Sequence, residues 1–301
     1  MIKLISDLKT ENLIKSLKEF SWEAAHIMIH YSQEIKNINN NSKLVKFKNN
    51  NEPVTIADLK VNRLIISRIK EKYPDIRWGF LSEENFKKDV YDYLDYEWLW
   101  VFDPLDGTKD FIQGTGNYAM HLALNYRNKP FIGIVLIPSR DELWISNGET
   151  LSCENKSGIK KKITLSRKKN LRDMTLVVSQ NHKDKYLKKL LSKIPCKEII
   201  SMGSIGCKIS SILRGESDLY LSLSDPQKGS PKDWDFAAPD AILKAAGGVI
   251  TNLENEEIVY NKKNLDHGGL IIASNDKTNH KFICNQLKVL IEQDNLIPFN
   301  Y

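Results

Sequence analysis

Residues 100–112 read WVFDPLDGTKDFI. Two carboxylates in this stretch, Asp103 and Asp106, follow an apolar run of the kind that forms a buried strand. Gly107 and Thr108 come next, at a turn whose backbone N–H groups can point outward and bind an anion. Carboxylates at the end of a strand are ligands that Mg²⁺ takes while it keeps positions open for phosphate and water. The same letters could form an ordinary turn, because Asp, Pro and Gly all favour turns.

Three further segments place acidic side chains at the ends of expected elements. The segment TIAD ends at Asp58 and is typical of a helix start in which Thr and Asp cap each other. The segment LSEE ends with Glu83 and Glu84 after a short apolar stretch. The segment KDWDFAA puts Asp235 at the beginning of an Ala-rich helix. Taken singly, these residues could be two helix caps and a solvated surface pair.

Taken together and in this order, the four segments resemble the inositol-monophosphatase-like superfamily of Mg²⁺-dependent, lithium-sensitive phosphatases. That family shows a TxxD helix start, an EE pair, a DPxDGT loop and a WDxAA helix start. The resemblance covers residues 53–248, which is most of the chain. It implies an α/β fold, a layered α-β-α-β-α sandwich with the metal site in the cleft between two halves. We expect residues 1–165 to form an antiparallel half with the metal-binding loops, and residues 166–301 an α/β half with the substrate contacts.

Periodicity in the first half agrees with this architecture. Apolar residues at helical spacing run from Leu13 to Ile35 and predict a long amphipathic first helix. Three strand-like runs, residues 98–102, 119–126 and 131–137, are joined by short polar turns, which is typical of an antiparallel meander.

Strand-like and helix-like segments alternate in the second half of the chain. Strands are expected at residues 176–179, 218–223, 248–252 and 270–274, and helices at 207–213, at 237–246 and at the C-terminus. Such alternation favours an α/β arrangement.

Composition narrows the class of protein. The 301 residues are 41% hydrophobic and 27% charged, as in ordinary soluble globular proteins. No apolar run approaches the roughly 20 residues that span a bilayer, and the N-terminus lacks the features of a signal peptide. The four cysteines are scattered without a CxxC pair, so neither zinc nor a disulfide framework is indicated. We therefore expect a cytoplasmic protein with no membrane partner, as a monomer or a homodimer.

The net charge of +6 comes partly from a Lys-rich run at residues 156–172. The run contains no aromatic side chain on which a base could stack. It therefore indicates a solvated connection between the halves rather than a nucleic-acid surface, and no nucleic-acid partner is expected. A basic protein can still attract a polyanionic small molecule.

The resemblance implies roles for individual residues. Two or three Mg²⁺ ions would be held by Glu83, Asp103, the Leu105 carbonyl, Asp106, Asp235 and Asp58. In this scheme Asp103 bridges two of the ions, and Asp58 lies nearer the attacking water. Thr108 would orient that water together with Asp58 or Glu83, and the N–H groups of Gly107 and Thr108 would bind phosphate oxygens.

The substrate class is indicated by the residues after Thr108. Inositol monophosphatases tend to carry a neutral residue and Asn there, whereas Lys109 and Asp110 resemble the 3'(2'),5'-bisphosphate nucleotidase (CysQ-type) branch. The segment VSQNH, which ends at His182, resembles that branch's nucleotide segment, with Gln where Arg is usual. Ser204 and Lys208 resemble its substrate-phosphate segment, with one residue more between them. Ser204, Lys208 and His182 are therefore predicted to bind a second phosphate.

The sequence thus predicts an enzyme that uses metal-activated water to hydrolyse the 3'-phosphate of adenosine 3',5'-bisphosphate, giving AMP and phosphate in sulfur metabolism. The partner would be a small phosphate monoester, and the resemblance implies inhibition by Li⁺. An inositol-1-phosphate or other sugar-phosphate phosphatase on the same scaffold is an alternative. A non-catalytic scaffold or RNA-associated factor is a remote one, because every acidic residue of the motifs is present.

Overall fold

The computed structural model describes residues 8–37, 44–47, 53–87, 90–166, 168–181, 185–225, 229–294 and 296–297. Its helices and strands are α1 (Thr10–Asn37), β1 (Val45–Phe47), β2 (Pro53–Thr55), α2 (Ile56–Lys72), β3 (Gly79–Ser82), β4 (Trp98–Asp106), α3 (Thr108–Gln113), β5 (Ala119–Tyr126), β6 (Lys129–Ile137), β7 (Glu142–Ser146), β8 (Leu151–Glu154), β9 (Thr175–Ser179), α4 (Lys185–Leu191), β10 (Glu198–Met202), α5 (Ile205–Leu213), β11 (Leu219–Ser224), α6 (Asp233–Ala245), β12 (Val249–Asn252), β13 (Gly269–Ser274) and α7 (Lys277–Asp294).

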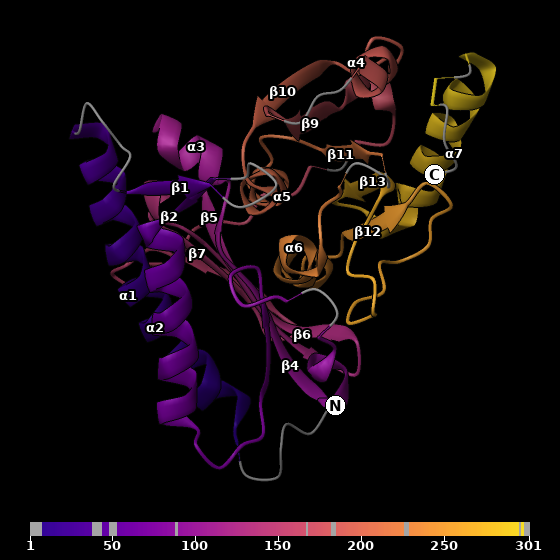
Figure 1. The fold of residues 1–301 in the computed structure, drawn as a ribbon. Coiled ribbons are helices and arrows are strands. Elements are labelled where there is room, and N and C mark those ends of the chain that lie inside the picture. The colour runs from indigo at the N-terminus through magenta and orange to yellow at the C-terminus, as the bar shows by residue number, and fades with distance from the viewer. Residues whose placement is uncertain are drawn as a thin grey trace.

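The first sheet has six strands in the order β3-β4-β5-β6-β7-β8. Strands β4 to β8 pair antiparallel, which confirms the predicted meander, while β3 runs parallel to β4. Helices α1 and α2 cover one face of this sheet, and α6 packs on strands β4, β5 and β6 from the other (Figure 1). Strand β4 extends beyond the predicted run 98–102 to Asp106, so the first two acidic residues of the motif belong to the strand itself.

The second sheet has five strands in the order β10-β9-β11-β13-β12. Strand β9 runs parallel to β10 and β11, and β13 runs antiparallel to β11 and β12. Helices α5 and α6 lie between the two sheets, and α4 and α7 lie on the outer side of the second sheet (Figure 1). The layers are therefore α, β, α, β, α, which confirms the fold class.

Helix α1 buries the face that its periodicity predicted. Leu13, Leu17, Phe20, Ala24 and Met28 are all buried. They pack in one cluster with α2 and the first sheet. Burial of such a stripe removes apolar side chains from water, at about 25 cal/mol per Å², and it holds α2 against the sheet.

Four details of the second half differ from the sequence expectations, and one of them is the short helix α4, which was not predicted. Helix α5 begins at Ile205 and not at 207, and α6 begins at Asp233 and not at 237, because both helices have polar or glycine-containing first turns that apolar periodicity does not detect. Strand β10 was missed because it is an edge strand whose side chains are mostly exposed. The early start of α6 places Asp235 inside its first turn.

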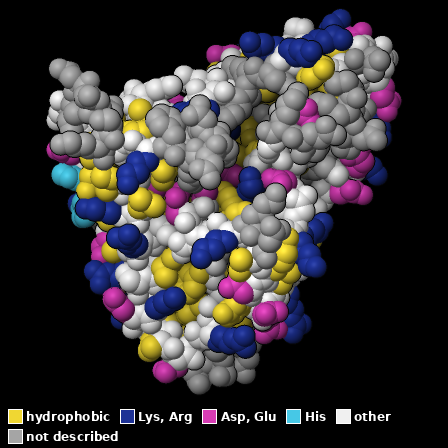
Figure 2. Space-filling view, viewed as in Figure 1, with side chains coloured by type: hydrophobic (Ala, Val, Ile, Leu, Met, Phe, Trp, Pro, Cys, Tyr) yellow, Lys and Arg dark blue, Asp and Glu magenta, His cyan; other side chains and the backbone are white. Residues whose placement is uncertain are grey.

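The Lys-rich run contacts both halves of the protein. Lys161 Nζ lies 3.6 Å from a carboxylate oxygen of Glu142, and Lys168 Nζ lies 2.9 Å from Asp218. Lys and Arg side chains are spread over the top, middle and bottom of the visible face (Figure 2). The expected division at residue 165 falls between the last strand of the first sheet and the first strand of the second, and it stays a prediction. Among the described helices, none has the length and apolar character that crossing a membrane requires.

Candidate active site

The end of strand β4 carries the first two acidic residues of the site. The β4–β5 register shifts between Asp103 and Asp106, and such an irregularity redirects side chains at the end of a strand. Asp103 is 2% exposed and accepts a hydrogen bond of 2.9 Å from the Leu105 backbone N–H. Single carboxylate oxygens of Asp103, Asp106 and Asp235 lie within 4.8 Å of one another. The first turn of α6 therefore meets the end of β4, as the motifs predicted.

Asp58 lies in the first turn of α2 and is held by the predicted capping box. Its Oδ2 accepts hydrogen bonds from the Thr55 backbone N–H at 2.8 Å and from the Thr55 hydroxyl at 2.5 Å. Its Oδ1 lies 3.4 Å from the hydroxyl of Thr108. Burial raises the pKa of Asp58 to about 7, with Glu83 and Glu84 adding to the shift and the Thr55 contacts opposing it. The helix cap is thus also part of the acidic site.

The electrostatics of the cluster are those of a site that needs a cation. Burial raises the pKa of Asp103 well above its usual range, and the charges of Glu83, Asp106 and Asp235 raise it further. Burial and Asp106 likewise raise the pKa of Asp235. Among the described residues, no Lys or Arg forms an ion pair with Asp103, Asp106 or Asp235. Hard carboxylate oxygens crowded in this way are the donor set of a divalent cation such as Mg²⁺.

Glu83 lies at the turn that follows β3, where its backbone N–H donates to the Phe102 carbonyl at 3.3 Å. This bond continues the parallel β3–β4 pairing and places Glu83 beside the end of β4. The charge of Glu83 raises the pKa of Asp103. The charge of Glu84, the next residue, raises the pKa of Asp58.

The turn after β4 depends on a glycine. Gly107 has φ of +86°, a left-handed conformation that glycine adopts without strain. A Cβ at this position would also lie 2.8 Å from the Asn117 carbonyl oxygen and 3.1 Å from the Ser204 backbone nitrogen. Thr108 follows, and its hydroxyl lies 3.1 Å from the Leu105 carbonyl oxygen. The hydroxyl is therefore close to both Asp58 and the end of β4.

Asp106 joins the two halves of the protein. Its Oδ2 accepts hydrogen bonds from the Ser204 hydroxyl at 2.7 Å and from the Ile205 backbone N–H at 2.5 Å. Ser204 has φ of +48° and caps α5 by accepting from the Cys207 N–H. The hydroxyl predicted to bind a second phosphate is therefore already bonded to Asp106.

His121 was missed by the sequence reasoning. It lies on β5, fully buried, with Nε2 3.2 Å from Asp106 Oδ2 and 3.0 Å from the Gly206 backbone N–H. Burial lowers its pKa, while Asp106 and the backbone of Trp234 and Asp235 oppose that shift. The available signal was a histidine within a mostly apolar strand.

Lys208 is buried rather than exposed on the surface. The side chain is 3% exposed, its Nζ is 3.5 Å from the Met202 carbonyl oxygen, and it lies 5.6 Å from the centre of the Tyr220 ring. Burial lowers the pKa of Lys208, and the charge of Asp106 opposes that shift. His182, the other residue predicted to bind the second phosphate, lies outside the described residues.

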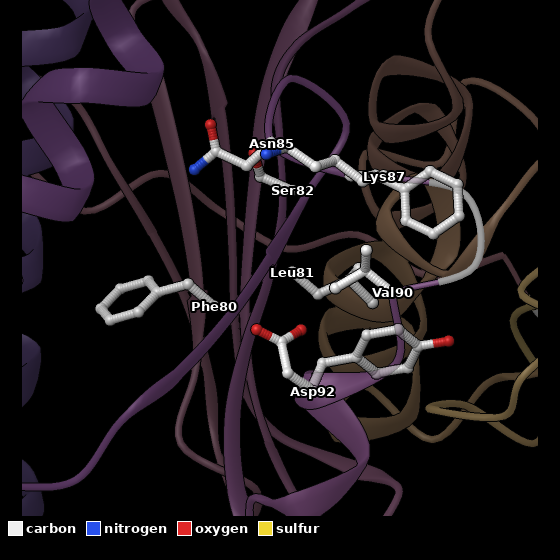
Figure 3. A pocket seen from close by; sticks show the side chains of 9 residues that line it. Phe80, Leu81, Ser82, Asn85, Lys87, Val90 and Asp92 are labelled. Carbon is white, nitrogen blue, oxygen red and sulfur yellow. The ribbon is translucent and has the colours of Figure 1, made fainter.

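A pocket of about 260 Å³ is lined by none of the residues of the acidic cluster. Its lining side chains come from β3 and the segment after it, and Phe80 points away from Leu81 in accordance with strand alternation (Figure 3). Ser82 and Asn85, which flank the two glutamates, are hydrogen-bonded through Asn62. The carboxylate cluster, and not this pocket, has the chemistry of a catalytic centre.

Known proteins resemble this chain in sequence and in fold. A 3'(2'),5'-bisphosphate nucleotidase CysQ of Buchnera aphidicola is 29% identical over 251 residues, covering 82% of this chain and 87% of that protein. The protein of the same name from Escherichia coli K12 is 30% identical over 214 residues, covering 71% and 81%. The solved structure of a Thermotoga maritima IMPase has the same fold, with a TM-score of 0.72 at 20% identity, covering 94% of this chain and 99% of that one.

The sequence model of the inositol monophosphatase family matches residues 9–292, so this chain belongs to that family. With its buried acidic cluster, the chain is a phosphatase of the inositol monophosphatase family.

Proposed function

We propose that this chain is a Mg²⁺-dependent phosphatase that hydrolyses the 3'-phosphate of adenosine 3',5'-bisphosphate to AMP and phosphate. The observation that carries the hydrolytic chemistry is the cluster of Asp103, Asp106 and Asp235, whose carboxylate oxygens lie within 4.8 Å of one another. The choice of substrate is supported by relatives named 3'(2'),5'-bisphosphate nucleotidase at 29% and 30% identity. It is also supported by Asp110, the acidic residue at which the loop departs from the pattern of inositol monophosphatases.

The groups proposed to hold two or three Mg²⁺ ions are Asp58, Glu83, Asp103, the Leu105 carbonyl, Asp106 and Asp235. Burial and mutual repulsion raise the pKa of Asp103 and Asp235, and a divalent cation would favour the ionised form of both. When bound, Mg²⁺ lowers the pKa of water and offsets charge on the phosphoryl oxygens.

Thr108 is proposed to orient the attacking water, with Asp58 and Glu83 beside it. Its hydroxyl has one proton, which it can donate to the Leu105 carbonyl at 3.1 Å or to Asp58 at 3.4 Å. The oxygen lone pairs then remain to accept a hydrogen bond from water, which orients it. The N–H groups of Gly107 and Thr108 would donate to phosphate oxygens at the same turn.

The second phosphate of the substrate is assigned to the α5 side of the site, with Ser204, Lys208 and His182 as its proposed partners. Lys208 supplies a positive charge that is 3% exposed and interacts with the charges of Asp106 and Asp235. A charge in such a position is screened less by solvent than one on the surface.

An inositol-1-phosphate phosphatase is the second candidate, and one observation favours it. The Ser204 hydroxyl is bonded to Asp106 and the Lys208 ammonium is buried, so both would have to rearrange to contact a second phosphate directly. A monophosphate makes no such demand. A non-catalytic scaffold is disfavoured, because such a protein would have no need to keep uncompensated carboxylates buried.

The test is the rate of phosphate release with Mg²⁺ from adenosine 3',5'-bisphosphate, inositol-1-phosphate and fructose-1,6-bisphosphate. We expect kcat/KM to be higher for the adenosine compound by about tenfold or more. The same reactions in EDTA, and with Asp103→Asn, are the controls for contaminating phosphatases. A preference for inositol-1-phosphate would overturn the nucleotidase proposal, and no Mg²⁺-dependent release from any of the three would overturn the phosphatase chemistry.

A further inference from the structure

Asp110 is a fully buried carboxylate next to the catalytic loop that the proposed chemistry does not use. It lies on α3, two residues after Thr108, and is 0% exposed. Its Oδ1 accepts a hydrogen bond of 2.7 Å from the Thr115 hydroxyl. Its Oδ2 accepts one of 2.6 Å from the side-chain amide of Asn181, which follows the end of β9. A side chain of the first half is thus bonded to a segment of the second.

The same carboxylate is in close contact with the turn that begins α5. A Cβ added at Gly203 would lie 2.2 Å from both Cγ and Oδ2 of Asp110. Gly203 precedes Ser204, whose hydroxyl donates to Asp106. Asp110 therefore contacts two segments of the second half, and one of these also holds a residue of the acidic cluster.

We propose that Asp110 is a positioning residue that holds the Asn181 segment and the Gly203–Ser204 turn against the loop containing Thr108. It thereby sets the affinity for a substrate that must contact both halves of the site. The inference rests on the proposed function, since a substrate with two phosphates is the one that spans both halves. Binding energy at the non-reacting phosphate is useful only if the two halves are held at the right separation.

The hydrogen-bond chemistry of the pair makes the proposal testable by exchange of the two residues. An ionised carboxylate only accepts hydrogen bonds, so Asp110 requires a donor at position 181. In Asn181→Asp, two carboxylates would face each other at a buried contact and repel. In Asp110→Asn with Asn181→Asp, the new amide would donate to the new carboxylate while its own oxygen still accepts from Thr115. The double variant keeps both the bond and the net charge.

The experiment measures KM and kcat for adenosine 3',5'-bisphosphate and for inositol-1-phosphate at saturating Mg²⁺. For Asn181→Asp we expect KM for the bisphosphate to rise about tenfold, the scale of one charge-assisted hydrogen bond, and KM for the monophosphate to rise by a smaller factor. In the double variant the bisphosphate KM should return to within about threefold of wild type. Asp110→Asn alone should not lower this KM, although a purely electrostatic effect on an anionic substrate would lower it.

Two control variants distinguish loss of the Asp110–Asn181 hydrogen bond from general effects of exchanging Asn and Asp. The exposed pair Asn170 and Asp173, 3.4 Å apart on the surface, permits the same exchange away from the site and should leave both KM values unchanged. If Asn181→Asp does not fold, Asn181→Ala removes the donor without adding charge and should show the same difference between the substrates.

Four results would be decisive. Failure of the double variant to recover, or equal losses on both substrates, would overturn the role of Asp110 while leaving the proposed function intact. A wild-type enzyme that hydrolyses only monophosphates would overturn the proposed function and this inference together. Recovery in the double variant with a difference between the substrates would support both.

Discussion

Asp103 and Asp218 are equally buried, each 2% exposed, but their surroundings carry opposite charge. Asp218, just before β11, accepts hydrogen bonds from the Thr175 backbone N–H at 2.7 Å and from Lys168 Nζ at 2.9 Å. Asp103, at the end of β4, accepts one from the Leu105 N–H and otherwise has carboxylates around it. Burial alone therefore does not separate a structural carboxylate from a candidate catalytic one.

The sign of the neighbouring charge separates them. The charge of Asp218 is balanced within the fold, where it ties the Lys-rich connection to the second sheet. The charge of Asp103 is not balanced by any Lys or Arg ion pair in the described part of the chain, so its ionisation costs free energy. A perturbed carboxylate with like-charged neighbours is the physical mark of a functional site.

The largest effect expected from this difference is on the pH dependence of the metal-free protein. Burial raises the pKa of Asp58 from near 3.8 to about 7, so its contribution to stability is present below about pH 4 and is lost as the pH rises through 7. The Asn variant has no carboxylate to ionise at this position. In EDTA, the unfolding free energy of Asp58→Asn minus that of wild type should therefore increase by about 4 kcal/mol between about pH 4 and pH 8. Urea unfolding of both proteins measures this difference in free energy, and saturating Mg²⁺ should reduce it. A difference that does not change with pH would show that Asp58 is not destabilised by its neighbours.

The next effect is on turnover. Asp103→Asn keeps the volume of the side chain and removes one charge from the centre of the cluster. We expect kcat to fall by about a hundredfold or more, with metal-free stability unchanged or higher because repulsion is relieved. Phosphate release at saturating Mg²⁺ measures the first quantity and thermal unfolding in EDTA the second. Retention of more than about a tenth of the wild-type rate would mean that Asp103 has no central role.

At Asp218 we expect a loss of stability without a loss of turnover, the opposite of the result expected at Asp103. Asp218→Asn leaves Lys168 without its partner, so the free energy of unfolding should fall by about 2 kcal/mol, while the folded variant keeps its kcat. Chemical denaturation and steady-state kinetics on one preparation measure both. If Asp218→Asn impaired catalysis as strongly as Asp103→Asn, the sign of the neighbouring charge would not distinguish the two kinds of site.

The acidic half of the site was predictable from sequence because it is local. Asp103, Asp106 and Thr108 lie within one short stretch, and a strand followed by a glycine turn brings them together whatever the rest of the chain does. Asp58 was found through its capping box, which is also a local pattern. The structure places these residues and Asp235 together, while their roles stay predictions.

The α5 side of the site was less predictable because its contacts join distant segments. The turn before α5 contains Ser204 at positive φ, and its hydroxyl bonds to a residue about a hundred positions earlier. His121 and the pair of Asp110 and Asn181 likewise make long-range contacts that no periodicity reveals. The layered fold was predictable, whereas the contacts between the two halves join residues far apart in the sequence and were not.

The buried ammonium group of Lys208 should have a moderate effect on activity that depends on the substrate. Lys208→Ala should lower kcat/KM for adenosine 3',5'-bisphosphate about tenfold, and that for inositol-1-phosphate by less, because only the bisphosphate has a second anionic group to attract. Lys208→Met, which preserves the buried volume, controls for packing. Equal losses on both substrates in the Met variant would remove Lys208 from substrate selection and leave it as a counter-charge to the acidic cluster.

The smallest expected effect concerns two carboxylates on helix α6. One of them lies beside another carboxylate, and the other lies beside a lysine that balances its charge. Asp235 in its first turn faces Asp106, whereas Asp240 one turn further on is 2.9 Å from both Lys244 Nζ and the Tyr260 hydroxyl. Asp235→Asn should raise the Mg²⁺ concentration for half-maximal activity about fivefold. Asp240→Asn, the matched control, should not, because Asn can still accept from Tyr260. A titration of activity against Mg²⁺ compares the two, and equal midpoints would exclude Asp235 from the metal site.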